Sequence, residues 1–162
     1  MGASILIAGL NKYFNFNRKV YVAESFEGLP PPDPNYQDDQ GSTLHNISWL
    51  SVDIDTVKNN FKKYNLLDDN VIFIKEFFEN SLKNSGIDKL SLLRLDGDMY
   101  SSTIQVLEEL YDKVSIGGYI IIDDYNCEAV ACKKAVDDFR NMRKIITQIE
   151  RIDWYGVFWK KE

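Results

Sequence analysis

Four short apolar runs alternate with amphipathic stretches along the chain. Continuous apolar runs of this length are typical of parallel strands that are covered by helices on both faces. They predict an α/β fold built on a mostly parallel sheet. The runs are KVYVAES at 19–25, NVIFIKE at 70–76, LSLLRLD at 90–96 and GYIIIDD at 118–124.

Two of the intervening segments have apolar residues at helical spacing. One follows Ser51 and the other follows Ser101 or Ser102, and these serines are the expected N-caps. We expect both segments to be amphipathic helices that cover the sheet. Their apolar residues are Ile54, Val57, Phe61 and Tyr64 in the first, and Ile104, Leu107, Leu110 and Tyr111 in the second.

The end of the chain has a different pattern. IITQIER at 145–151 and WYGVFWK at 154–160 are separated by two residues, which allows an antiparallel hairpin but no parallel crossover. The sequence therefore predicts a doubly wound α/β sheet that closes with an antiparallel pair, in one domain over 1–162.

One long segment, 27–50, interrupts this alternation. It contains all four prolines and the only histidine, His45, and few periodic apolar residues. Loops of this length inside a compact domain usually have a function. We expect a lid-like loop.

Composition narrows the possible partners. The net charge of −6 and the pI of about 4.9 argue against nucleic-acid or anionic-membrane binding. No stretch approaches the ~20 apolar residues of a membrane span, and the first residues lack a signal-peptide pattern, so we expect a cytoplasmic protein with small-molecule partners. Cys127 and Cys132 are expected to be free thiols.

Acidic residues follow two of the predicted strands. Asp96 and Asp98 come directly after 90–95, and Asp123 and Asp124 come directly after 118–122. Each pair alone is equally typical of turns and helix caps. Both pairs together favour a site for a hard divalent ion such as Mg²⁺, because neighbouring carboxylates repel one another unless a cation joins them.

Two further residues, Glu24 and His45, have possible roles that the sequence does not decide. Glu24 ends an early strand, where an acid can accept both hydroxyls of a nucleotide ribose, but no G-x-G-x-x-G turn accompanies it. His45 is either a general base over the strand ends or a solvated loop residue.

The wording of several segments resembles the macrocin O-methyltransferase (TylF-type) family. The resemblance runs in order through VYVAESFEGLP, the loop with His45, SVDIDTVKNNFKKYNLLDDNVIFIKEFFENSL, LLRLDGDMYSST, VSIGGYIIIDDY and DWYGVFWK. It implies the class I, Rossmann-like methyltransferase fold, with S-adenosyl-L-methionine (AdoMet) and Mg²⁺ as cofactors. It also implies methylation of a hydroxyl group of a sugar or a related natural-product acceptor.

The resemblance implies roles for individual residues. Asp96, Asp123 and Asp124 are similar to the metal ligands, and Asp96 or His45 to the group that takes the proton from the acceptor hydroxyl. Glu24, with Ser25 and Phe26 beside it, is similar to the ribose-binding segment. Gly2 and Asp98 complete the implied cofactor residues, and the alternatives for Asp98 are a place beside the metal ligands or the role of metal ligand itself.

The chain departs from the family pattern at its beginning. Family members have an upstream strand and a Gly-Gly turn, so we expect the N-terminal strand and glycine loop to be missing, and the missing strand to belong between 19–25 and 90–96. A shortened, non-catalytic remnant is one alternative, with a homo-oligomer covering the incomplete sheet. The second alternative is a different Mg²⁺-dependent enzyme, because Asp-Gly-Asp is also typical of glycosyltransferases and phosphatases. The phosphatase pattern, however, requires Thr at the position of Tyr100.

Overall fold

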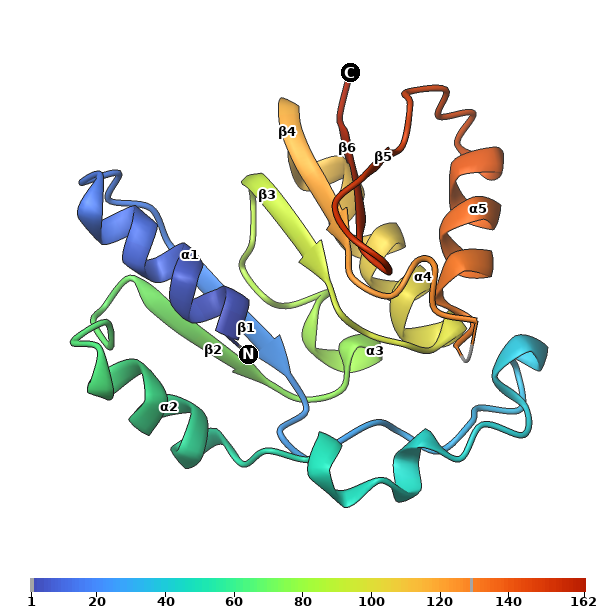
Figure 1. Ribbon diagram of the computed structural model, residues 1–162, viewed down its shortest axis with the longest axis horizontal. Helices are drawn as coiled ribbons and strands as arrows, with labels where there is room; N and C mark the ends of the chain where they lie inside the picture. The colour runs from blue at the N-terminus through green and yellow to red at the C-terminus, as the bar shows by residue number, and fades with distance from the viewer. Residues whose placement is uncertain (1, 129) are drawn as a thin grey trace. The chain divides into compact units, whose positions relative to one another are not determined.

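The computed structural model describes residues 2–128 and 130–162, whose strands form two sheets. Parallel β1 and β2 make one sheet, and the other has the order β3-β4-β6-β5 (Figure 1). The chain divides into two compact units. The first contains the residues up to Pro30 and Thr43–Phe77, and the second contains Pro31–Ser42 and Phe78–Glu162.

The helices and strands alternate over most of the chain, as the apolar pattern predicts. In chain order they are α1 (Gly2–Tyr13), β1 (Val20–Glu24), α2 (Ile54–Lys63), β2 (Val71–Lys75), α3 (Phe78–Ser81), β3 (Leu90–Leu95), α4 (Tyr100–Leu110), β4 (Val114–Ile122), α5 (Cys132–Met142), β5 (Glu150–Arg151) and β6 (Val157–Lys160).

The first unit packs α1 and α2 against the β1–β2 pair. Val20 and Val22 point to the same face of β1 because strand side chains alternate, and one connected core joins them to both helices. Ala8 of α1 and Phe61 of α2 are buried in that core. Both helices therefore cover the same face of the pair.

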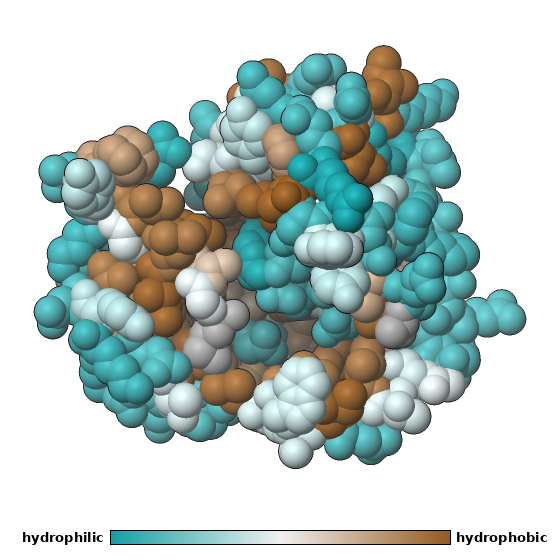
Figure 2. All heavy atoms as spheres, viewed as in Figure 1, coloured by the Kyte–Doolittle hydropathy of each residue, from teal (hydrophilic) through white to brown (hydrophobic). Residues whose placement is uncertain are grey.

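The other face of α1 remains apolar at the surface. Leu6 and Leu10, one helical turn apart, are exposed, and Figure 2 shows hydrophobic side chains gathered over this helix. Tyr13 and Phe14 extend the exposed apolar surface to the end of the helix.

The second unit contains a mixed sheet. β3 and β4 are parallel, whereas β6 runs antiparallel to both β4 and β5. Helices α4 and α5 pack against each other, and the ring of Tyr111, in the 3₁₀ turn directly after α4, lies 5.2 Å from that of Phe139 in α5. Trp159 of β6 and Ile120 of β4 are fully buried, so the core of this unit lies under the central strands.

The antiparallel ending is confirmed, but its first strand is shorter than expected. Only Glu150–Arg151 of the predicted 145–151 segment is a strand. Helix α5 ends in a left-handed Lys144, and the N–H of Ile145 still donates to the carbonyl of Arg140 (2.9 Å). Because the backbone of 144–145 belongs to this helix ending, it does not pair with a strand.

The two predicted N-caps are wrong. Asp53, not Ser51, caps α2, and its carboxylate accepts from the N–H of Thr56. Helix α4 begins before the expected serines, with Met99 at the N-cap position and no side-chain bond from that residue. The N–H groups in the first turn of α4 instead donate to Asp39, which lies far away in the sequence.

The 27–50 segment contains three short 3₁₀ turns, at Gln37–Asp39, Leu44–Asn46 and Ser48–Leu50. Its middle part, Pro31–Ser42, belongs to the second unit, and the flanking parts belong to the first. The lid-like role of this segment and the single-domain boundary stay predictions.

Within the described ranges, every helix is too short or too polar to cross a bilayer.

Candidate functional site

The acidic residues after β3 and β4 lie at one end of the second sheet. Asp96 directly follows β3, and Asp123 and Asp124 directly follow β4. The arrowheads of the two strands point the same way (Figure 1), and the N–H of Asp123 donates to the carbonyl of Leu95 at 3.0 Å. The sequence prediction that these strand ends meet is therefore confirmed.

Arg94 is the cation that contacts two of these carboxylates. Its guanidinium donates to Asp96 at 3.1 Å and also to Asp123. The side chain is only 21% exposed, so the attraction is screened less than on an open surface. Sequence reasoning missed this residue, although strand alternation places Arg94 and Asp96 on the same face of the chain.

Asp124 lies in a less favourable setting. Its Oδ2 is buried and has no hydrogen-bond partner in the described part of the chain. Burial, together with the negative charges of Asp98 and Asp96, raises the pKa of this carboxyl group to about 6. A buried carboxylate oxygen without a donor is a natural ligand for a cation.

The donor set fits Mg²⁺ in its chemistry. Carboxylate oxygens are the ligands that this ion uses, and water or substrate oxygens usually complete its coordination. Over residues 2–128 and 130–162, however, no three His, Cys, Asp or Glu side chains stand at the spacing of an assembled metal centre. The assignment of Asp96, Asp123 and Asp124 as ligands stays a prediction.

A tight turn connects β3 to α4. Asp98 in this turn is left-handed, with φ of 55°, an unusual conformation for a residue other than glycine. Gly97 leaves little room for a side chain, since a Cβ there would lie 3.2 Å from the Cβ of Ser102. The turn therefore presents Asp96 and Asp98 in a constrained backbone.

The predicted cofactor residues other than Asp98 belong to the first unit. Glu24 ends β1 with an exposed side chain, and its Oε1 accepts from the N–H of Ser25 at 3.0 Å. The hydroxyl of Ser25 donates to the carbonyl of Gly28 at 2.7 Å, so it holds the turn itself. Phe26 is buried and packs near Phe73. Gly2 is the first residue of α1.

His45 also belongs to the first unit. It lies in the Leu44–Asn46 turn and is exposed to solvent. The exposure leaves its imidazole accessible, and its role as a base stays a prediction.

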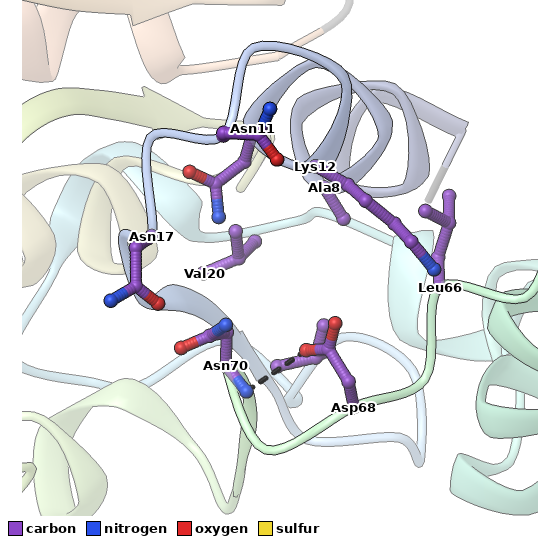
Figure 3. A pocket seen from close by; sticks show the side chains of 10 residues that line it. Ala8, Asn11, Lys12, Asn17, Val20, Leu66, Asp68 and Asn70 are labelled. Atoms are coloured by element: carbon purple, nitrogen blue, oxygen red, sulfur yellow. Dashed lines mark hydrogen bonds between the residues drawn. The ribbon is translucent and has the colours of Figure 1, made fainter.

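A polar pocket of about 310 Å³ lies at the amino-terminal ends of β1 and β2, so at the end of β1 away from Glu24 (Figure 3). Its polar side chains hold the backbone around it, since Asn11 donates to the carbonyl of Arg18 at 2.5 Å and Lys12 to that of Asn65 at 2.7 Å. None of the predicted site residues lines this pocket.

Comparison with known proteins identifies relatives over nearly the whole chain. Demethyldecarbamoylnovobiocin O-methyltransferase of Streptomyces niveus is 41% identical over 99% of this chain. Mycinamicin III 3''-O-methyltransferase of Micromonospora griseorubida is 37% identical over 99% of this chain. The chain spans 62% and 64% of the lengths of these two curated relatives.

Solved structures show the same fold. The structure of the O-methyltransferase NovP superposes with a TM-score of 0.94 at 41% identity, over 99% of this chain and 67% of that one. The calicheamicin methyltransferase CalS11 superposes with a TM-score of 0.70 at 13% identity, over 96% of this chain and 66% of that one, which is a likeness of fold alone. The α/β methyltransferase fold expected from the sequence is confirmed.

The family model described as macrocin-O-methyltransferase (TylF) matches residues 1–161. The chain belongs to this family.

Proposed function

We propose that the chain functions in AdoMet- and Mg²⁺-dependent O-methylation, with a hydroxyl group of a sugar or a related natural-product molecule as the methyl acceptor. The observation that carries the proposal is the group of carboxylates at the ends of β3 and β4, with the unpaired buried oxygen of Asp124. Family membership supports it, and the relatives named above are O-methyltransferases.

Three carboxylates are proposed to hold the ion. Asp96, Asp123 and Asp124 would supply its protein ligands, and bound Mg²⁺ would orient the acceptor and stabilise negative charge on its hydroxyl oxygen. Arg94 keeps two of these carboxylates together through its contacts with Asp96 and Asp123. These contacts support the proposal by holding two of the three proposed ligands next to each other.

Methyl transfer also needs a base. The methyl carbon leaves the sulfonium sulfur and bonds to the acceptor oxygen, while the hydroxyl proton moves to a protein group. Asp96 is proposed as this group because its side chain is 46% exposed and reaches solvent at the strand end. Exposed His45 is the alternative acceptor of the proton.

The donor is proposed to bind at Glu24. Its exposed carboxylate at the end of β1 suits the two hydroxyls of the AdoMet ribose. Ser25 supports this role indirectly, because its N–H donates to Glu24 Oε1 at 3.0 Å. This bond restrains the orientation of the carboxylate.

Binding and turnover together test this function. Isothermal titration with AdoMet should show binding, and a nucleotide sugar or a phosphate ester in the same buffer should not bind. Transfer of a labelled methyl group to a sugar-containing acceptor should be lost in Asp96→Asn. Asp88→Asn is the matched control, since it removes the same charge from an exposed position ahead of β3. Preferential binding of the nucleotide sugar, or full transfer by Asp96→Asn, would contradict the proposal.

A further inference from the structure

The carboxylate of Asp39 holds the first turn of α4 from a distant part of the sequence. Asp39 lies in the Gln37–Asp39 turn and is only 2% exposed. One of its oxygens accepts from the N–H of Tyr100 at 2.7 Å, and the other accepts from the N–H of Ser101 at 2.9 Å. These are N–H groups at the start of a helix, which have no acceptor within the helix.

This arrangement replaces the local cap that α4 lacks. Met99 occupies the N-cap position without a side-chain bond, so the capping acceptor comes from a residue about 60 positions earlier. A buried carboxylate is costly unless hydrogen bonds satisfy it, and here each oxygen receives one. Each oxygen of Asp39 and each of these two N–H groups of α4 therefore has a defined partner.

The start of α4 is also the end of the turn that carries Asp96 and Asp98. Gly97, Asp98 and Met99 separate Asp96 from the first helical residue, so a shift of the helix start moves the turn directly. Asp98 holds its left-handed conformation, with φ of 55°, within this turn. Aspartate adopts this conformation more readily than most residues other than glycine, so the sequence of the turn is compatible with its shape.

Two other contacts join the same segment to the helices. The ring of Tyr36 lies 6.0 Å from that of Tyr100, and Asp38 forms an ion pair with Lys134 of α5 at 3.4 Å. Asp38 is 36% exposed, and its ion pair is with α5, whereas its buried neighbour Asp39 binds the backbone of α4. The two adjacent aspartates therefore contact different helices.

We propose that Asp39 is a positioning residue of the candidate metal site: it fixes the start of α4 and thereby the turn that presents Asp96 and Asp98. The importance of this turn for Mg²⁺ rests on the proposed function, whereas the fixing of the turn does not. Through Asp39, the Pro31–Ser42 part of the 27–50 segment supports the candidate metal site.

The test uses three variants of the full chain: Asp39→Ala, Asp39→Asn and the control Asp38→Ala. Amide hydrogen exchange at Tyr100 and Ser101 reports on the start of α4, and exchange at Met99, whose N–H donates to Gly97, reports on the turn. Isothermal titration with MgCl₂ reports on the ion, at a temperature where each variant is folded. We expect Asp39→Ala to accelerate the exchange and to weaken Mg²⁺ binding by about tenfold or more, as the loss of supporting hydrogen bonds does at other metal sites. Asp39→Asn, which keeps one carbonyl acceptor, should lie between it and the wild type.

The control separates this role from a loss of charge on the segment. Asp38→Ala should leave both measurements within about twofold of the wild type, because exposed ion pairs contribute little. Unchanged exchange in both Asp39 variants would overturn the proposal, and so would faster exchange with unchanged Mg²⁺ affinity. If Asp39→Ala does not fold, Asp39→Asn gives the decision. If the wild type binds no Mg²⁺, the metal part of the proposed function fails, and the exchange rates still decide whether Asp39 fixes the turn.

Discussion

Asp124 combines a buried carboxylate oxygen, the lack of a hydrogen-bond partner for that oxygen in the described chain, and neighbouring negative charges. Without a bound cation, the ionised form of this residue opposes folding, because its charge is partly desolvated and repelled by Asp96 and Asp98. Residues with such an energetic cost are concentrated at functional sites.

This cost predicts an unusual stability change at a single residue. In metal-free protein at pH 7, Asp124→Asn should raise the melting temperature by roughly 2–4 °C, which corresponds to about 1 kcal/mol for a chain of this size. Addition of MgCl₂ should stabilise the wild type and leave the variant almost unchanged, since the variant lacks a ligand. Thermal unfolding followed by circular dichroism, with EDTA or with MgCl₂, measures both effects.

Asp112→Asn is the control, because Asp112 pairs with Arg143 away from the carboxylate cluster. A metal-free Asp124→Asn protein that melts well below the wild type would show that the carboxylate stabilises the fold in some other way.

Individual site residues were predictable to the extent that they follow strands. The end of an apolar run locates Asp96, Asp123 and Asp124, and the parallel arrangement brings the strand ends together. Arg94 was within reach of the same reasoning, since it precedes Asp96 by two strand positions. Asp39 was not, because its partners lie about 60 positions away and nothing in the local sequence points to them.

Gly118 in β4 and Gly9 in α1 differ in the space that a side chain would have. At Gly118 in β4, a Cβ would lie 2.9 Å from the carbonyl oxygens of Ser115 and Ser91. At Gly9 in α1, a Cβ would meet only the Cδ1 of Leu66, at an ordinary 3.7 Å.

The same substitution is therefore expected to have opposite effects in the two elements. Gly118→Ala should lower the free energy of unfolding by about 1–3 kcal/mol, because backbone atoms must move to admit the methyl group. Gly9→Ala should raise it by about 0.5–1 kcal/mol, because alanine is the better helix former. Urea unfolding followed by tryptophan fluorescence measures both. Equal losses in the two variants would contradict the close approach of β3 and β4 around Gly118.

Element types were more predictable than element ends. The four apolar runs all contain strands, since an extended backbone that is covered on both faces favours runs of branched and aromatic residues. Both predicted helices are present, but their first residues depend on which acceptor satisfies the free N–H groups. That choice is made by Asp53 for α2 and by the distant Asp39 for α4.

For the whole molecule, the order of elements was sufficient to predict the class of fold. The superposition on NovP confirms it over 99% of this chain. The separation of the described strands into two sheets, and of the chain into two compact units, is not visible in the apolar pattern, because such patterns specify strands and not their hydrogen-bonded neighbours. The expected missing strand and the expected homo-oligomer stay predictions.

The central claim, that methyl transfer requires a divalent cation held at the ends of β3 and β4, has one direct test. Transfer of a labelled methyl group from AdoMet to a sugar-containing acceptor is measured after chelation with EDTA and again after addition of MgCl₂. We expect EDTA to abolish the transfer and MgCl₂ to restore it in the wild type but not in Asp123→Asn. Transfer that continues at its full rate in EDTA would show that the reaction needs no cation at these strand ends.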